Sequence, residues 1–362
     1  MNRSPLGLLR AALLAAAVAL APAAGTARAD QASDALAKYH QPIDESIDKA
    51  LVYLAGQQQK DGSFASGSMT GNVGITSLCV MAFLAKGYTP GQGPYHQQIQ
   101  KGIDFVLDHR DDDSGLLRGL PKRASHGPMY GHTISALLLS EVSGMVDPAR
   151  QERIDKALAN ALRVILSAQQ IEKDKKHAGG WRYQPTSKDS DISCTGWAVM
   201  TLRSARGNGA KVPNNSIADA IEYVLRCRNG DGGFAYQPGG SSGLARTGTA
   251  LLCLELAGQH GKPVTRAAGD YILNNRPGRF GQGGFFYYGL YYASQGMFQL
   301  GGKHWQKWAE HMYEMMLAHQ SKKDGSWPSG SGNEAKAGQA YATAMAVLAM
   351  TVSYRQLPIY QR

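Results

Sequence analysis

One short element occurs six times along the chain and limits what it can fold into. It joins a glycine to an aromatic residue, as in QQQKDGSF (57–64), RNGDGGFAY (228–236) and QSKKDGSW (320–327), and a degraded copy is RDDDSGLLRG (110–119). The residues in the aromatic position are Phe64, Leu117, Trp181, Phe234, Phe285 and Trp327, separated by 53, 64, 53, 51 and 42 residues. Repetition at such intervals predicts six copies of one structural unit.

Each copy lies between two segments with helical periodicity. The preceding segment is amphipathic, with apolar residues every three or four positions, as in IDKALANALRVILSAQ. The following segment is apolar nearly all round, as in NVGITSLCVMAFLAKG. This alternation predicts an outer and an inner layer of helices, and hence an all-α fold without strands: an (α/α)6 toroid, or barrel, of six helical hairpins. The alternative is an open superhelix of helix pairs.

The repeated element itself has a structural interpretation. Its Asp-Gly pair is suited to a tight reversal between the outer and the inner helix. We expect the aromatic residue to pack between adjacent hairpins and the preceding glutamine to hydrogen-bond the ends of neighbouring helices. We therefore assign no catalytic role to Trp327 or its equivalents.

The N-terminal residues have the pattern of a secretory signal. Arg3 and Arg10 precede an apolar run, and Ala27-Arg28-Ala29 is a cleavage site of the small-x-small type. The alternative is an uncleaved membrane anchor, for which the run is short. We thus expect an extracytoplasmic protein, periplasmic or secreted, without a stable membrane span after signal removal. The predicted parts are a signal peptide (1–29), an N-terminal extension (30–42), a single toroid domain (43–354) and a C-terminal tail (355–362).

Charge and cysteine content narrow the ligand classes. The net charge of +10 falls to +7 without the three arginines of the signal, and the basic residues are scattered along the chain. This pattern does not favour nucleic acid, and it fits an anionic small molecule or a glycan better. The four cysteines form no C-x-x-C pair, so neither a metal site nor a cofactor is predicted. Cys194 and Cys227 begin and end antiparallel neighbours, which predicts a disulfide between them.

The segment from Lys49 to Phe64 reads Lys-Ala-x-x-Tyr-Leu-x-x-x-Gln and then Gly-Ser-Phe. It resembles the QW repeat of squalene cyclases, and the chain from about residue 43 to 354 looks like a member of the terpenoid cyclase and protein prenyltransferase group of α/α toroids. The resemblance implies the fold more than an activity.

Two activities of that group lack their residues here. Squalene-hopene type cyclases resemble one another in an Asp-x-Asp-Asp-Thr-Ala segment, and DISCTG matches it with Asp191 and Thr195, whereas Ser193 and Cys194 replace the other two acids. A serine cannot protonate an alkene. The prenyltransferase zinc site of Asp, Cys and His has no matching Asp-x-Cys. Neither cyclisation nor prenyl transfer is therefore expected.

A closed ring would collect the starts of all inner helices at one mouth, with a positive bias from their amides. Arg123, Arg182, Arg246 and Arg279 lie in or near the same loops. For each of them taken singly, a solvated rim residue is the plainer interpretation. Arg246 differs, because at the start of an inner helix its charge must face the cavity or find a partner.

Two inner helices carry further candidates. In FFYYGLYYASQGMFQL, Tyr288, Tyr292, Gln295 and Gln299 share one helical stripe, which is typical of either a cavity wall or ordinary core. Tyr130 and His132 begin another inner helix, where a core histidine is the plainer interpretation. Together with an arginine, however, they match the base and charge neutraliser that uronate β-elimination needs.

Three functions follow as hypotheses. The first is an exported cyclase- or prenyltransferase-like repeat protein that binds an apolar or anionic ligand in its central cavity, without established catalysis. The second is a secreted polysaccharide lyase acting on uronates, and the third is a non-catalytic module that binds a protein partner. The catalytic candidates are Tyr130, His132, Asp191, Arg246 and Tyr288. The candidate ligand-binding residues are Trp197, Tyr292, Gln295, Gln299, Arg182 and Arg279.

Overall fold

The helices alternate between an outer and an inner layer, as predicted. The computed structural model describes residues 35–119, 127–332 and 334–360. The outer helices are α2 (His40–Gln57), α4 (His96–Asp108), α6 (Pro148–Gln170), α8 (Asn214–Arg226), α10 (Pro263–Asn274) and α12 (Gly302–His319). The inner helices are α3 (Val73–Ala85), α5 (Met129–Val142), α7 (Ile192–Gly207), α9 (Leu244–Leu256), α11 (Phe286–Leu300) and α13 (Gly338–Met350). Short 3-10 turns complete the fold: η1 (Gly67–Met69), η3 (Glu334–Ala337), η4 (Val352–Tyr354) and η5 (Pro358–Tyr360).

The two layers differ in burial as their sequences require. All thirteen residues of the inner helix α3 are buried. The outer helix α8 buries one face, which includes Ile217, Ala220, Ile221 and Val224 at helical spacing. Among the described residues β pairing is limited to isolated bridges, and three of these close copies of the repeated element: Gln58–Phe64, Arg110–Leu117 and Arg228–Phe234. The all-α prediction is confirmed.

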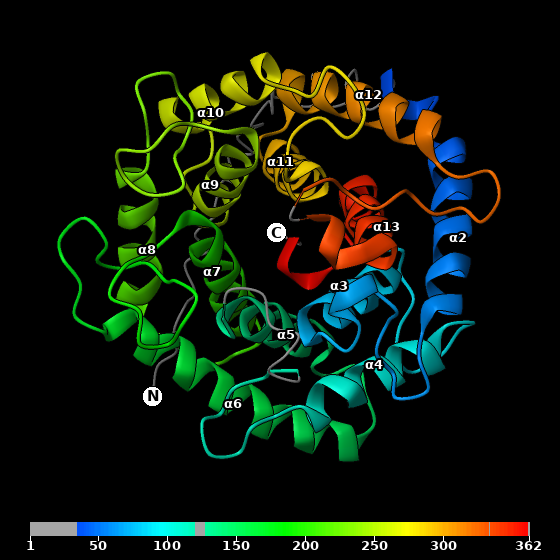
Figure 1. Ribbon diagram of the computed structural model, residues 1–362. Helices are drawn as coiled ribbons and strands as arrows, with labels where there is room; N and C mark the ends of the chain where they lie inside the picture. Colours follow the sequence, from blue (N-terminus) through cyan, green and yellow to red (C-terminus); the bar gives the residue numbers. More distant parts are fainter. Residues whose placement is uncertain (1–34, 120–126, 333, 361–362) are drawn as a thin grey trace, which may run out of the picture.

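The six hairpins close into a ring, so the open superhelix is excluded (Figure 1). Each inner helix packs against the next, and α13 returns to α3 while α12 returns to α2. At the closing seam, Gln320 Nε2 donates to the carbonyl of Ser46 at 2.7 Å. The hydroxyl of Tyr39 donates to the carboxylate of Glu314 at 2.6 Å across the same seam.

The glutamine of the repeated element links successive hairpins. Gln58, Gln169 and Gln320 each donate to a carbonyl of their own loop and to a carbonyl of the next outer helix. Trp181 and Trp327 each donate the indole N–H to a carbonyl of the preceding outer helix. The element is therefore structural, as predicted.

The glycine of the element does more than turn the chain. A Cβ on Gly62 would lie 2.2 Å from the carbonyl oxygen of Lys101, and one on Gly325 would lie 2.6 Å from the Cβ of Lys49. Both glycines have positive φ. Only a residue without a side chain lets these loops approach the next outer helix so closely.

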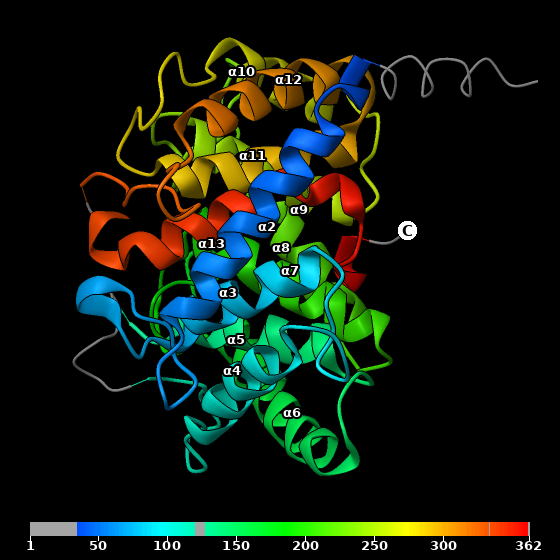
Figure 2. The same cartoon turned by 90° about the vertical axis from the view of Figure 1, so that its right-hand side faces the viewer.

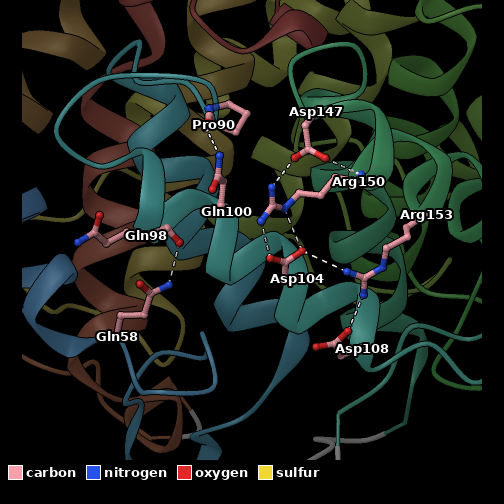
Figure 3. A network of polar contacts seen from close by, with 9 residues as sticks. All are labelled: Gln58, Pro90, Gln98, Gln100, Asp104, Asp108, Asp147, Arg150 and Arg153. Atoms are coloured by element: carbon pink, nitrogen blue, oxygen red, sulfur yellow. Dashed lines mark hydrogen bonds and ion pairs between the residues drawn. The ribbon is translucent and has the colours of Figure 1, made fainter.

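Charged side chains connect outer helices α4 and α6 (Figure 3). Arg150 Nε and Nη2 donate to the two carboxylate oxygens of Asp104, at 3.0 and 2.8 Å. Arg153 reaches Asp104 at 3.2 Å and Asp108 at 2.5 Å. The bidentate geometry fixes the spacing of the two helices on the outside of the ring.

Two expectations about packing are wrong. Phe285, assigned to the aromatic position of the fifth repeat, is 56% exposed because α11 begins at the next residue and leaves no loop to fold it inward. The disulfide between Cys194 and Cys227 does not form, and all four cysteines are free and buried.

The C-terminal segment, set apart as a tail from the sequence, packs against the ring. Leu357, Ile359 and Tyr360 are 4–7% exposed. In Figure 1 this segment lies over the centre of the ring, and in Figure 2 it lies on the face opposite the loops that precede the inner helices. The signal (1–29) and Arg123 lie outside the described residues.

Candidate functional site

A cavity of about 640 Å³ occupies the centre of the ring at the end where the inner helices begin. Every inner helix contributes to its wall, and one residue from each in chain order is Ile75, Tyr130, Trp197, Arg246, Tyr288 and Tyr341. The six helices therefore begin at one mouth, as the ring predicts. The volume lies within the usual range of small-molecule pockets.

The inner part of the cavity is apolar and aromatic. Leu78, Ile134 and Met345 line it together with Trp197 and Tyr288. Trp197 is 1% exposed, and within the described residues its Nε1 has no hydrogen-bond partner. An unpaired buried donor costs about 1–3 kcal/mol.

Arg246 brings positive charge to the mouth. Its Nη1 donates to the carbonyl of Ser241 at 2.7 Å, and no carboxylate of the described residues forms an ion pair with it. Arg118 also lines the cavity, where its guanidinium pairs with Asp111. Among the described residues that line the cavity, Arg246 is thus the cation whose charge is left for a ligand.

At three of the six inner helices, a side chain of the protein already accepts hydrogen bonds from backbone amides of the first turn. Asn72 accepts from the amide of Ile75 at the start of α3, and Asp191 accepts from the amides of Ser193 and Cys194 at the start of α7. At α11 the carboxylate of Glu334 accepts from the amides of Tyr287 and Tyr288, at 3.2 and 2.9 Å. Within the parts of the chain that the structure describes, helices α5, α9 and α13 have no side-chain cap. Their first amides, together with Arg246, are the groups left there to attract an anion.

Glu334 is a cavity residue that the sequence did not reveal. It is 4% exposed, it lines the cavity, and its carboxylate also accepts from the hydroxyl of Tyr341 at 3.4 Å. The pKa of this carboxyl is raised, because burial raises it by more than the hydrogen bonds to the carboxylate lower it. The sequence feature that could have pointed to Glu334 is that it is a single acidic residue in the Gly-rich segment before α13.

Asp191 and Arg182 lie behind the wall rather than in it. Asp191 is fully buried, and burial raises the pKa of its carboxyl to about 6. Its Oδ2 lies 3.7 Å from Nε of Arg182, whose guanidinium lies 4.5 and 5.5 Å from the ring centres of Tyr183 and Tyr236. These two tyrosines line the cavity. The ion pair therefore supports an aromatic part of the wall.

His132 is a core residue. Its Nδ1 accepts from the amide of Leu117 at 3.0 Å, its Nε2 faces the carbonyl of Ala161 at 3.2 Å, and it is fully buried. Burial lowers the pKa of the imidazole to about 4. With both nitrogens engaged away from the cavity, it is not placed to act with Tyr130 and Arg246.

The remaining candidates divide between core and surface. Tyr292 lies beneath the cavity, with its ring centre 5.3 Å from that of Trp197 and 4.8 Å from that of Tyr288. Gln295 donates to the carbonyl of Leu348, and Gln299 is also buried outside the lining. Arg279 is exposed in the loop before α11. The structure thus brings together Tyr130, Trp197, Arg246 and Tyr288.

Metal ligation and membrane insertion need their own side-chain groups and helices. No group of three or more His, Cys, Asp or Glu side chains that could hold a metal ion occurs in residues 35–119, 127–332 and 334–360. In the same ranges no helix has the length and apolar character needed to cross a bilayer.

Solved structures share the ring at low sequence identity. The apo type II terpene cyclase MstE from Scytonema aligns with a TM-score of 0.54 at 14% identity, over 88% of this chain and 99% of that one. A variant of MstE in complex with its substrate geranylgeranyl dihydroxybenzoate aligns with a TM-score of 0.55 at 12% identity, over 89% and 100% of the two chains. A family 76 glycoside hydrolase from a bovine Bacteroides thetaiotaomicron strain aligns with a TM-score of 0.63 at 8% identity, over 86% and 77%. These similarities show a common fold.

A comparison with proteins of curated function found no match. The model of the prenyltransferase α/α-toroid domain matches residues 27–170 and, again, residues 94–286. Together these matches span well over half of the sequence and four of the six inner helices, α3, α5, α7 and α9. The chain belongs to the prenyltransferase α/α-toroid domain family.

Proposed function

We propose that this chain is an exported protein that binds an amphiphilic ligand, with an apolar body in the central cavity and an anionic head at Arg246. The observation that supports it is the division of the cavity into an apolar, aromatic interior and a mouth with an arginine that lacks a carboxylate partner. The MstE complex, which holds geranylgeranyl dihydroxybenzoate, supports a ligand of this class.

Catalysis at this site is less well supported. Among the described residues that line the cavity, Glu334 is the one carboxylate, and two backbone amides hold it. Glycoside hydrolysis ordinarily needs two carboxyl groups that flank the bond. Uronate elimination needs a base, and His132 is engaged in the core. Asp191 lies behind the wall, so an alkene in the cavity would not meet its carboxyl directly.

The module hypothesis is also less favoured. A ring that serves only to present its outer surface to a protein needs no central space, and its core would gain stability if side chains filled it. A cavity of about 640 Å³ is large for an unused void.

The ligand can be sought directly. Native mass spectrometry of residues 30–362, purified after export, would reveal a retained small molecule. A dansyl-labelled fatty acid then serves as the binding probe, with the corresponding fatty alcohol as a competitor without charge. We expect Arg246→Gln to weaken binding of the fatty acid by about tenfold, since a hydrogen bond to a charged group contributes about 1.5 kcal/mol or more. The affinity for the alcohol should stay unchanged.

The matched control is Arg279→Gln, which removes an exposed arginine outside the cavity lining. It should leave both affinities unchanged. Equal losses in the two variants, or no binding of either amphiphile, would refute the proposal. Absorbance from unsaturated uronate after incubation with pectate would support the lyase instead.

Export has a separate test. The full chain, expressed in a bacterial host, should appear in the periplasmic fraction with Asp30 as its first residue. A cytoplasmic product that keeps Met1 would contradict export and leave the binding proposal standing.

A further inference from the structure

The C-terminal segment reaches into the ring from the face opposite the mouth (Figures 1 and 2). The backbone amide of Ile359 donates to the carboxylate of Glu141 on α5 at 3.1 Å. The hydroxyl of Tyr360 forms a hydrogen bond of 2.8 Å with that of Tyr291 on α11, and it lies 3.7 Å from Sδ of Met200 on α7. One short turn is thereby attached to three inner helices.

Tyr291 connects Tyr360 to the wall of the cavity. Its ring is stacked on the indole of Trp197, with ring centres 5.7 Å apart and an angle of 13° between the planes. Trp197 lines the cavity, whereas Tyr291 and Tyr360 do not. The order from the cavity outward is therefore Trp197, Tyr291, Tyr360.

The cavity wall at Trp197 is thus supported from behind by the stacked ring of Tyr291. The hydroxyl of Tyr291 is in turn hydrogen-bonded to Tyr360, which belongs to the short turn Pro358–Tyr360. Aromatic side chains that lose a supporting neighbour can change rotamer, because close packing is what holds them.

We propose that the turn Pro358–Tyr360 fixes the depth of the cavity, and hence the length of the apolar chain it accepts, through Tyr291 and Trp197. This inference rests on the proposed function. Tyr360 is a positioning residue, since it acts through Tyr291 and does not touch the cavity.

The first test needs no ligand. Acrylamide quenching of Trp197 is obtained as the difference between each chain and the same chain with Trp197→Phe, which removes the contribution of the other tryptophans. Tyr360→Ala should increase the quenching of Trp197. Tyr360→Phe keeps the ring but loses the hydrogen bond to Tyr291, so its quenching should lie between those of the wild type and Tyr360→Ala. A chain truncated after Gln356 should resemble Tyr360→Ala, and a chain ending at Tyr360 should resemble the wild type.

The second test measures binding of saturated fatty acids of increasing length by displacement of the dansyl probe. Affinity in the wild type should increase about fourfold for each methylene, from about 0.8 kcal/mol per buried CH₂, and then level off at a limiting length. In Tyr360→Ala the increase should continue to longer chains, while the affinity for shorter ones is unchanged. Tyr360→Phe, which loses the hydrogen bond to Tyr291, should have a limiting length between those of the wild type and Tyr360→Ala.

The outcomes separate the two proposals. Unchanged quenching of Trp197 in Tyr360→Ala, with the fold intact by circular dichroism, would overturn the role of the turn whatever the ligand is. The same limiting length in every variant would overturn it as well. Increased quenching without binding of any fatty acid would refute the proposed function and leave the support of Trp197 by Tyr360 in place.

Discussion

At the scale of single residues, His132 occupies a position that other repeats give to threonine. The hydroxyls of Thr195, Thr247 and Thr343 accept from the amides of Trp181, Phe234 and Trp327, as the imidazole of His132 accepts from the amide of Leu117. Each acceptor is in the first turns of an inner helix and serves the residue in the aromatic position. The histidine therefore satisfies a recurrent backbone donor.

Substitution of His132 should reveal that role. His132→Ala leaves the amide of Leu117 buried without an acceptor, which should lower the free energy of unfolding by about 1–3 kcal/mol in addition to the cost of the cavity. His132→Thr, which offers a hydroxyl from the same position, should recover part of that loss. Urea denaturation at neutral pH measures both. Equal destabilisation by the two changes would show that the hydrogen bond to Leu117 is not what His132 contributes.

At the scale of elements, the ring depends on loops that lie directly against the next outer helix. The loop of the sixth repeat makes this approach to α2 at Gly325, and so closes the ring. Gly144, after α5, has a similar positive φ of 83° against 76°, but a Cβ there would meet no atom within 4 Å. The two glycines share a backbone conformation and differ in their surroundings.

Substitution of these two glycines separates the energetic cost of the backbone conformation from the cost of the close approach to α2. Gly144→Ala should cost about 1–2 kcal/mol for the left-handed backbone alone. Gly325→Ala should add about 1–3 kcal/mol, because the new methyl group would overlap Lys49 and push α2 away. Thermal unfolding followed by circular dichroism compares the two, and equal shifts in Tm would mean that the seam adjusts without cost.

What could be predicted from the sequence is what depends on local backbone conformation and pattern, and what could not is what depends on surroundings formed by distant parts of the chain. Helical periodicity and the repeated element were enough for the two layers and the ring, because they depend on neighbours along the chain. The loops before the inner helices could also be placed at one mouth, and with them Tyr130, Arg246 and Tyr288. Glu334 could not be placed, because it meets the first turn of α11, 46 residues earlier in the chain, only once the ring has closed. Phe285 was misplaced because the fifth repeat lacks the loop that the others share.

At the scale of the whole molecule, two buried groups give its stability opposite dependences on pH. Burial raises the pKa of Glu141 to about 7, and its carboxylate accepts from the hydroxyl of Ser204 and the amide of Ile359. No cation of the described residues forms an ion pair with it, and, after burial, its charge contributes to raising the pKa of Tyr291 and of Tyr360. For His132 the pKa is lowered to about 4. Glu141 therefore stabilises the fold most when protonated, whereas His132 does so when neutral.

The sign of each effect follows from linkage. The stability due to Glu141 is fully present below its unfolded pKa of 4.5, and is lost as the pH rises through 7. The stability due to His132 is present above its unfolded pKa of 6.5, and is lost as the pH falls through about 4. Between pH 4.5 and 6.5 the two contributions to the free energy of unfolding change in opposite directions. The stability of the wild type should therefore depend only weakly on pH in this range, and its pH profile does not show either group separately.

Glu141→Gln separates them, since glutamine is isosteric and does not titrate. The stability of the wild type relative to this variant should fall by roughly 3 kcal/mol between pH 4.5 and 7.5, on the order of 1.36 kcal/mol for each unit by which the pKa is raised. Urea denaturation at several pH values measures the difference, with Glu152→Gln on the exposed surface of α6 as the control. A constant difference would mean that Glu141 titrates in the folded ring as it does in the unfolded chain. The C-terminal turn would then be attached to a hydrated carboxylate, and raising the pH would not loosen the segment that supports Tyr291 and Trp197.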